Sequence, residues 1–337
     1  MALVIPEGYR NILGNLENTE KAIKAVKDMF QDNLSAQLAL LRVTAPMVVL
    51  SGTGLNDDLN GVERPVSFPV KGMEGRQAEI VHSLAKWKRM KLYQMGTKPG
   101  RGIYTDMNAL RPEEDLDNIH SIYVDQWDWE KVITRENRNS EYLKLIVWAI
   151  VRAICDTNDR LHVRFPQLRT ELCRDVSFVT SQALEDMYPH LKTGSEREKA
   201  YVKEHRTACI MQIGRKLRSG KPHDGRAPDY DDWNLNCDIF FWDEVLDRAL
   251  EISSMGIRVD ADSLDRQLKE SGCDDRRALP FHKMLLNDEL PLTIGGGIGQ
   301  SRLCMLMMGC CHIGEVQASV WDQQTMAACE QAGIPLL

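Results

Sequence analysis

Polar residues alternate with tryptophans in the segment Tyr123–Glu130, which reads Tyr-Val-Asp-Gln-Trp-Asp-Trp-Glu. Successive side chains of a β-strand point to opposite faces, so Gln126 and Asp128 are expected on one face and Trp127 and Trp129 on the other. A polar face opposite a tryptophan face is typical of a pocket floor that is backed by a hydrophobic core.

Just before this strand, Arg111 is followed by a run of acidic residues, Glu113, Glu114 and Asp115. We interpret the run as a hairpin loop between an arginine and the returning strand. The alternative is a solvated hairpin in which Arg111 pairs with a surface acid and contributes little.

Two further acids and an arginine lie on segments that read as neighbouring strands. Asp238 precedes an apolar run, and Glu251 lies seven residues before Arg258. Acids on adjacent strands can hold Mg²⁺ between the protein and nucleotide phosphates, and an arginine can bind a carboxylate through two parallel hydrogen bonds. Taken singly, each of these residues would more often belong to an ordinary salt bridge.

The segment Thr293–Arg302 reads as a strand, a glycine turn, an arginine and the start of a buried helix. Glycine lets the backbone approach a ligand closely, and an arginine at that point can stack on a base or bind phosphate. The glycine spacing matches neither a dinucleotide-binding fingerprint nor a P-loop, and a plain turn is the alternative. Together with Arg111, these clusters predict a site for a nucleotide and a small acid.

The elements that must position these residues form an α+β fold. Apolar residues at steps of three and four predict a long helix over Thr19–Leu41, and Leu41–Leu50 reads as an edge or interface strand that carries Pro46. Strands and helices do not alternate regularly, which favours a mainly antiparallel β-sheet flanked by helices, in a single domain over residues 1–337. Further strands are predicted at Ala78–Val81, Ile122–Asp125, Val176–Thr180, Ala208–Ile213, Ile239–Trp242 and Ile257–Asp260. Further helices are predicted at Leu84–Tyr93, Asn139–Cys155, Ser181–Tyr188, Ser195–Glu204, Ala261–Ser271 and Ser301–Met308.

The composition is that of a soluble globular protein. Hydrophobic residues make up 43% and charged residues 27% of the 337 residues, and the net charge of −7 gives no broad basic field for nucleic acid. The nine cysteines form no Cys-x-x-Cys pair, so we expect reduced thiols and no structural zinc. The most apolar run, Tyr142–Ile154, is too short to cross a membrane, and the N-terminus lacks the features of a secretory signal. A cytoplasmic enzyme is therefore expected.

Several of these segments resemble a known family. The hairpin at Arg111–Glu130, the run Gly295–Arg302 and the strand with Pro46 are similar to motifs 2, 3 and 1 of the class II aminoacyl-tRNA synthetases. Within that superfamily, nearly the whole chain resembles the ammonia-dependent asparagine synthetases of the A type. The additional segments that carry the resemblance are His82–Arg89, Arg226–Trp233 and Ser253–Asp260.

The resemblance implies a catalytic domain of the class II synthetase type and the amidation of L-aspartate by ammonia, with ATP as a substrate and Mg²⁺ as the metal. The reaction would pass through a β-aspartyl-adenylate and give L-asparagine, AMP and pyrophosphate. It also implies a homodimer built on the motif 1 strand and the helix before it, and neither a tRNA nor a membrane partner.

Roles of individual residues follow from the resemblance alone. The residues implied at the reacting groups are Asp57, Arg111, Gln126 and Arg302. Those implied for aspartate are Ser83, Lys88, Asp128, Asp231, Ser254 and Arg258, with Lys88 and Arg258 holding the α-carboxylate of a reversed substrate. Those implied for the nucleotide are Arg111, His120, Tyr123, Gly297, Gly299 and Arg302, with Val124 as a rival of Tyr123 beside the base. The implied Mg²⁺ ligands are Asp238 and Glu251.

Three other functions related to this superfamily fit the sequence less well than asparagine synthesis. Only some 40 residues precede motif 1, which is short for an anticodon-binding barrel, and the acidic balance also disfavours a tRNA synthetase. A degenerate amino-acid sensor would be expected to have lost Arg111 or Arg302, and a glutamine-dependent synthetase would need an N-terminal cysteine where residue 2 is alanine. The chain departs from the family pattern chiefly between Trp233 and Asp238, where a loop is shorter.

Overall fold

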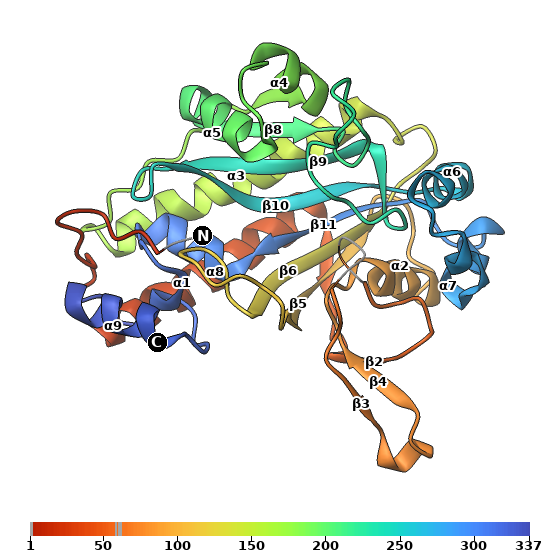
Figure 1. Ribbon diagram of the computed structural model, residues 1–337, viewed down its shortest axis with the longest axis horizontal. Helices are drawn as coiled ribbons and strands as arrows, with labels where there is room; N and C mark the ends of the chain where they lie inside the picture. The colour runs from red at the N-terminus through yellow and green to blue at the C-terminus, as the bar shows by residue number, and fades with distance from the viewer. Residues whose placement is uncertain (1–2, 58, 60–62) are drawn as a thin grey trace.

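A large β-sheet forms the centre of the molecule in the computed structural model, which describes residues 3–57, 59 and 63–337 (Figure 1). Its strand order is β1-β5-β6-β11-β10-β9-β8-β7. The β1–β5 and β7–β8 pairs are parallel and the other neighbours are antiparallel, which confirms the predicted α+β class. The strands are β1 (Leu40–Arg42), β5 (Gly102–Leu110), β6 (Tyr123–Val132), β7 (Ser177–Thr180), β8 (Thr207–Met211), β9 (Asp231–Asp243), β10 (Arg248–Arg258) and β11 (Thr293–Gly299).

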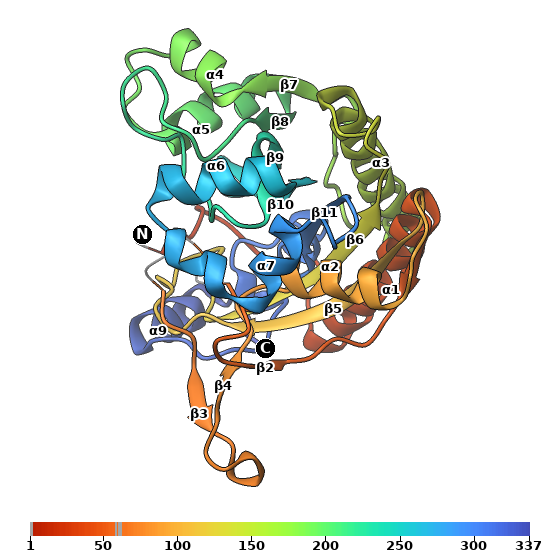
Figure 2. The same ribbon diagram turned by 90° about the vertical axis from the view of Figure 1, so that its right-hand side faces the viewer.

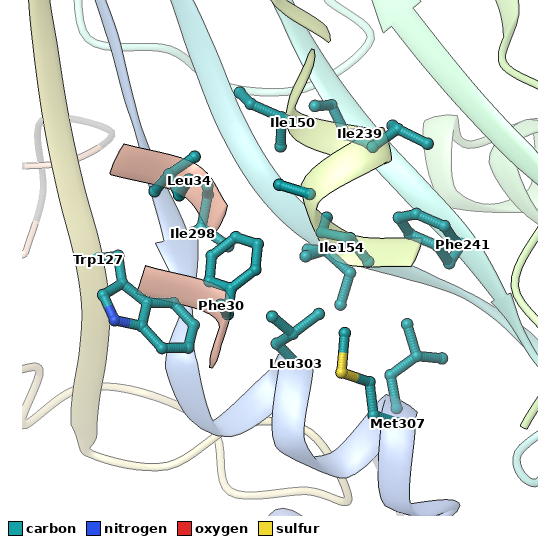
Figure 3. Packing of buried hydrophobic residues seen from close by; sticks show 14 of the residues in the cluster. Phe30, Leu34, Trp127, Ile150, Ile154, Ile239, Phe241, Ile298, Leu303 and Met307 are labelled. Carbon is teal, nitrogen blue, oxygen red and sulfur yellow. The ribbon is translucent and has the colours of Figure 1, made fainter. Parts of the chain in front are cut away.

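One face of this sheet is covered by helices α1 (Leu16–Leu38), α3 (Ser140–Arg164) and α8 (Gln300–Met308). The predicted alternation in β6 is confirmed there, because Trp127 and Trp129 have no exposed surface. Figure 3 shows Phe30 of α1 beside Trp127, with ring centroids 4.6 Å apart, and Ile154 of α3 in the same cluster. The apolar stripe of α1 is thus buried within the chain.

The opposite face of the central strands carries helix α2 (Ala85–Gln94), whose Lys88 contacts Asp128 of β6 and Gly296 of β11. Figure 2 shows α6 (Ala261–Ser271) and α7 (Pro280–Leu286) on the side of the molecule away from α1 and α3. The remaining helices are α4 (Ser181–Met187), α5 (Gly194–His205) and α9 (Gln323–Ala332), with 3₁₀ turns η1 (Lys71–Met73), η2 (Asp274–Ala278) and η3 (Ile313–Glu315). No helix in the described ranges combines the length and apolarity needed to cross a membrane.

A second, three-stranded sheet has the order β2-β4-β3, and its β3–β4 hairpin projects from the body of the molecule (Figures 1 and 2). Its strands are β2 (Val48–Leu50), β3 (Ser67–Pro69) and β4 (Gln77–Ile80). The single strand expected over Leu41–Leu50 is therefore wrong: β1 and β2 belong to different sheets, and Pro46 lies between them. A proline has no backbone N–H to give to a ladder, which suits the point where the chain leaves one sheet for another.

Other strand predictions erred mainly in their extent. The strand expected at Ile257–Asp260 is only the end of β10. Strand β6 extends past both the strand expected at Ile122–Asp125 and the alternation over Tyr123–Glu130, to Val132. Strands β3 and β5 and helices α7 and α9 were not predicted. Because β6, β9 and β10 each carry polar residues through the site, their sequences do not show the uninterrupted apolar pattern of a buried strand.

Candidate active site

A cavity of about 410 Å³ lies on the polar face of the central strands β6, β11, β10 and β9. It gathers all but one of the residues predicted for the site, although they come from distant parts of the chain. Those lining it are Asp57, Ser83, Lys88, Arg111, His120, Tyr123, Gln126, Asp128, Asp231, Glu251, Ser254, Arg258, Gly297, Gly299 and Arg302. Asp238 does not line it.

At one end of the cavity, two cations are almost entirely removed from solvent. Lys88 of α2 donates to Asp128 and to the carbonyl oxygen of Gly296, the latter at 3.1 Å. Arg258, at the end of β10, donates through Nη1 to Asp231 Oδ1 at 2.5 Å. Buried cations of this kind are stable only when acids surround them, and they provide strong partners for a small carboxylate.

Glu130 completes this cluster. It was not among the site residues predicted from the sequence. It has no exposed surface, its Oε2 accepts from Arg258 Nη2 at 2.7 Å, and its Oε1 accepts from the Thr293 hydroxyl at 2.7 Å. Burial opposes its ionisation, but the charges of Arg258 and Lys88 hold the pKa of Glu130 below its usual value. The period-two alternation that identified Gln126 and Asp128 also applies to Glu130.

Burial changes the ionisation of the other members of the cluster. It lowers the pKa of Lys88, against the opposing charge of Asp128, and it raises the pKa of Asp231, against the charge of Arg258. Three acids, Asp128, Glu130 and Asp231, thus stand against two cations at this end of the cavity. A ligand that brings both an ammonium and a carboxylate, as a free amino acid does, can pair with both kinds of group.

Beside this cluster, the glycines of β11 are sites of close approach. They lie within the strand and do not form the turn expected from the sequence. A Cβ at Gly295 would come within 2.1 Å of Glu130 Oε2, and one at Gly297 within 2.1 Å of Gln126 Oε1. The missing side chains therefore leave room for the polar groups of β6 that face the cavity.

The other end of the cavity carries the two predicted nucleotide arginines. Arg111 follows β5, and its backbone N–H bonds to Ile122 O at 2.8 Å, which closes the hairpin expected from the sequence. Its Nη1 lies 3.8 Å from Glu114, so the acid of the loop does pair with it. Arg302 of α8 donates through Nη1 to the carbonyl oxygen of Glu251 at 3.2 Å.

Three residues predicted for the nucleotide, His120, Tyr123 and its rival Val124, line the same cavity. Both Tyr123 and Val124 line the cavity, so the choice between them stays open. The Tyr123 hydroxyl donates to Asn108 Oδ1 at 2.6 Å. His120 lies 2.8 Å from Asp117 through its Nδ1.

Asp57 also lines the cavity and is buried, with 3% of its surface exposed. Its Oδ1 accepts from the Leu59 N–H at 3.2 Å, and its carbonyl oxygen lies 3.0 Å from His82 Nδ1. A turn acid with no function would be expected in solvent. The burial of Asp57 against the cavity is compatible with a role in chemistry.

The predicted metal ligands are on adjacent strands, as expected. Asp238 of β9 pairs with Arg226, whereas Glu251 of β10 lies at the cavity wall. Burial, together with the nearby charge of Glu251, raises the pKa of Asp238 to about 7 despite Arg226. Among the described residues, no group of three or more His, Cys, Asp or Glu side chains is arranged to hold a metal ion.

Arg226 and Tyr230 also line the cavity and were not predicted as site residues. The Arg258 guanidinium lies 5.8 Å from the centroid of the Tyr230 ring, within the range of a cation–π contact. Both residues belong to the long polar loop before β9. The sequence shows which residues of that loop are basic, but only the folded structure shows which of them line the cavity.

Comparison with known proteins identifies the family. The family model described as aspartate-ammonia ligase matches residues 17–333. The chain belongs to the aspartate–ammonia ligase family. It is 57% identical over 336 residues to the aspartate–ammonia ligase of Ruminiclostridium cellulolyticum, with 100% of this chain and 99% of the relative covered. It is 55% identical to that of Clostridium tetani, with 99% and 98% covered.

Solved structures of a wider group of proteins share the fold of this aspartate–ammonia ligase family member. An aspartyl-tRNA synthetase from Entamoeba histolytica aligns with a TM-score of 0.64 and 16% identity, covering 94% of this chain and 60% of that one. The asparaginyl-tRNA synthetase of Pyrococcus horikoshii, solved with asparaginyl-adenylate, gives 0.62 and 14%, covering 92% and 73%. The fold is therefore that of the class II synthetases.

One departure from the ligase family pattern has a structural counterpart. The sequence predicts a shortened loop between Trp233 and Asp238. These residues lie within the span of β9, but the β9–β10 ladder is irregular here, because residues 232–235 have no partner between the Asp231–Arg258 and Asn236–Gly256 pairs. The shorter loop expected here thus falls on the irregular part of the strand.

Proposed function

We propose that this chain catalyses the ATP-dependent amidation of L-aspartate by ammonia, through a β-aspartyl-adenylate, to give L-asparagine, AMP and pyrophosphate. The observation that carries the proposal is one cavity with a buried amino-acid end, at Lys88 and Arg258, and a nucleotide end, at Arg111 and Arg302. Membership of the aspartate–ammonia ligase family supports the choice of substrates.

The charges of the buried end determine how aspartate would lie. Its α-carboxylate would bind Lys88 and Arg258, and its α-ammonium would bind the acids Asp128 and Asp231, with Ser83 and Ser254 as neutral partners on the cavity wall. The β-carboxylate would then point along the cavity towards Gln126 and the nucleotide.

In the first half-reaction, a β-carboxylate oxygen forms a bond to the α-phosphorus of ATP, and the bond to the leaving pyrophosphate breaks. Both reactants are anions, so the barrier contains a large electrostatic repulsion. Arg111 would offset it at the α-phosphate and Arg302 at the base and phosphate, with Gly297 and Gly299 in the cavity wall.

In the second half-reaction, the nitrogen of ammonia forms a bond to the activated carbonyl carbon, and AMP leaves. The attacking nitrogen must lose a proton as the C–N bond forms. An ionised Asp57 at the cavity wall would attract ammonium, which must first lose one proton to solvent to become the nucleophile ammonia. Asp57 would then accept the second proton as the C–N bond forms, which is general-base catalysis.

The residues predicted to bind Mg²⁺ suit that ion in part. Asp238 has a buried Oδ1 that makes no hydrogen bond, and hard carboxylate oxygens are the ligands Mg²⁺ prefers. Asp238 and Glu251 would supply protein ligands, and nucleotide phosphates the others. The ion, when bound, would neutralise phosphate charge as pyrophosphate leaves.

Product analysis tests the proposal. Incubation with ATP, aspartate and ammonium is expected to give asparagine and AMP in equal amounts, and chelation of magnesium should abolish both products because the ion would neutralise the charge of the leaving pyrophosphate. Formation of ADP instead of AMP would contradict the adenylate. Persistence of AMP formation after chelation would contradict the metal assignment alone.

We also propose a homodimer, but the surface that supports it differs in part from the strand and helix expected from the sequence. The apolar face of α1 is covered within the chain, so that face is not available to a partner. Large apolar side chains are instead exposed just after it, with Leu41 at 58% and Met47 at 53%. Light scattering at micromolar concentration is expected to give twice the monomer mass, because two such surfaces can cover each other around a twofold axis. A monomer would contradict this.

The nine cysteines are all free thiols. Reduced thiols are usual in a reducing compartment, which supports a cytoplasmic location for the enzyme.

A further inference from the structure

Asp229 is the centre of a buried charge cluster that lies outside the cavity. Its Oδ2 accepts from Lys86 Nζ at 3.0 Å and from Arg276 Nη1 at 3.0 Å, and it lies 2.9 Å from His282 Nε2. Asp229 and His282 have no exposed surface, and 4% of Lys86 is exposed. None of these residues lines the cavity, so the cluster makes no direct contact with a substrate there.

Three members of this Asp229 cluster, Asp229, Lys86 and His282, are each connected to a different part of the cavity wall. Asp229 directly precedes Tyr230 and Asp231, and Lys86 lies on α2 two residues before Lys88. The cluster therefore ties the loop before β9 to helix α2 with a charge-assisted bond that water cannot reach.

The third connection runs through His282 of α7 to the segment that carries Asp57. Gly54, three residues before Asp57, has a φ of +76°, and a Cβ there would come within 3.1 Å of His282 Nδ1. The imidazole thus packs close to the backbone of this segment at Gly54, without a hydrogen bond from its Nδ1 to any described residue. Because the other ring nitrogen faces Asp229, the position of the Asp57 segment is set relative to the Asp229 cluster.

The nucleotide end of the cavity is built separately. Arg111, Glu251 and Arg302 are carried by the β5–β6 hairpin, β10 and α8, and these elements contribute no residue to the Asp229 cluster. A disturbance of the cluster should move Asp57 relative to bound aspartate while leaving the nucleotide contacts in place.

We propose that Asp229 is a positioning residue that, through Lys86 and His282, fixes the distance between the ammonia-accepting segment at Asp57 and the aspartate pocket at Lys88 and Asp231. This inference rests on the proposed function. In this inference the cluster affects the second half-reaction, in which ammonia must attack the adenylate before water hydrolyses it.

The test separates the two half-reactions in His282→Leu, with His282→Gln as the variant that can still donate to Asp229. His282→Leu is expected to raise the ammonium KM about tenfold or more, because sub-ångström misplacement is costly in an oriented reaction. Its yield of asparagine per AMP should fall as water captures the adenylate, while aspartate-dependent pyrophosphate exchange into ATP stays within about threefold of the parent. His282→Gln should restore most of the ammonium KM. Asp229→Asn should show the same pattern as His282→Leu.

Asp243→Asn serves as the matched control, since Asp243 is a buried carboxylate at the end of β9, with 3% exposed, and accepts from the Val245 N–H at 2.9 Å. It should lower the melting temperature without changing the ammonium KM. The proposal is overturned if folded His282→Leu keeps the parental ammonium KM and asparagine yield, or if both half-reactions fall together. A parent enzyme that forms no AMP would reject the proposed function instead.

Discussion

Replacement of Asp57 by Asn is expected to lower asparagine synthesis about a hundredfold or more, the range in which general-base groups contribute. Asn keeps the size of the side chain and can still accept from the Leu59 N–H, so the local turn should persist. It cannot take up a proton or attract ammonium by its charge. The first half-reaction needs neither, so aspartate-dependent pyrophosphate exchange into ATP should stay within about tenfold of the parent.

The comparison of exchange with synthesis decides the role of Asp57. Equal losses in both assays would place the residue in aspartate binding or adenylation, and full activity would return it to the role of a turn residue. Asp115→Asn is a suitable control, because Asp115 is an exposed acid of the Arg111 hairpin and does not line the cavity. It should leave both assays unchanged.

Replacement of Arg258 by Ala is expected to have the largest effect on aspartate binding. The guanidinium bonds to Glu130 and Asp231, which are buried, so its removal leaves two acids without their main counter-ion. Breaking such a buried pair costs about 3–5 kcal/mol of stability. Loss of a charged partner of the α-carboxylate should also raise the aspartate KM about a hundredfold, with little change in the ATP KM, because such contacts are worth about 2–5 kcal/mol.

A matched arginine separates binding from folding. Arg138 donates to Asp232 at 2.6 Å and lies 3.2 Å from Asp260, but it does not line the cavity. Arg138→Ala should therefore lower the melting temperature without a change in aspartate KM. An unchanged aspartate KM in folded Arg258→Ala would reject the reversed pose, whereas a rise in both the aspartate and the ATP KM would point to general collapse of the cavity.

Periodic patterns in the sequence were sufficient for the two faces of the central sheet. The alternation Gln126-Trp127-Asp128-Trp129 placed the core and the cavity floor correctly because each strand residue faces away from its neighbours. The steps of three and four in α1 likewise predicted its buried stripe. In both cases the pattern is local, and one buried surface is enough to impose it.

The resemblance to a family supplied what no local pattern contained. Asp57 lies in a polar Gly/Asn-rich loop, Ser83 precedes a helix and Ser254 lies in a strand, and nothing in their immediate sequence joins them. Their meeting in one cavity depends on contacts across much of the chain. The roles of the individual residues await the variants above.

Only the tertiary structure revealed how the charges are shared. Glu130 reads as one more acid in an acidic stretch, yet its bonds to Arg258 and Thr293 join β6 to β10 and β11. The glycines of β11 read as a turn, but they are strand residues whose missing Cβ atoms admit the side chains of β6. The sequence determined which residues are able to ionise, bond or pack. Which of them meet was decided by strand order and register, because a buried charge is stabilised only by the partners that the fold brings within a few ångströms.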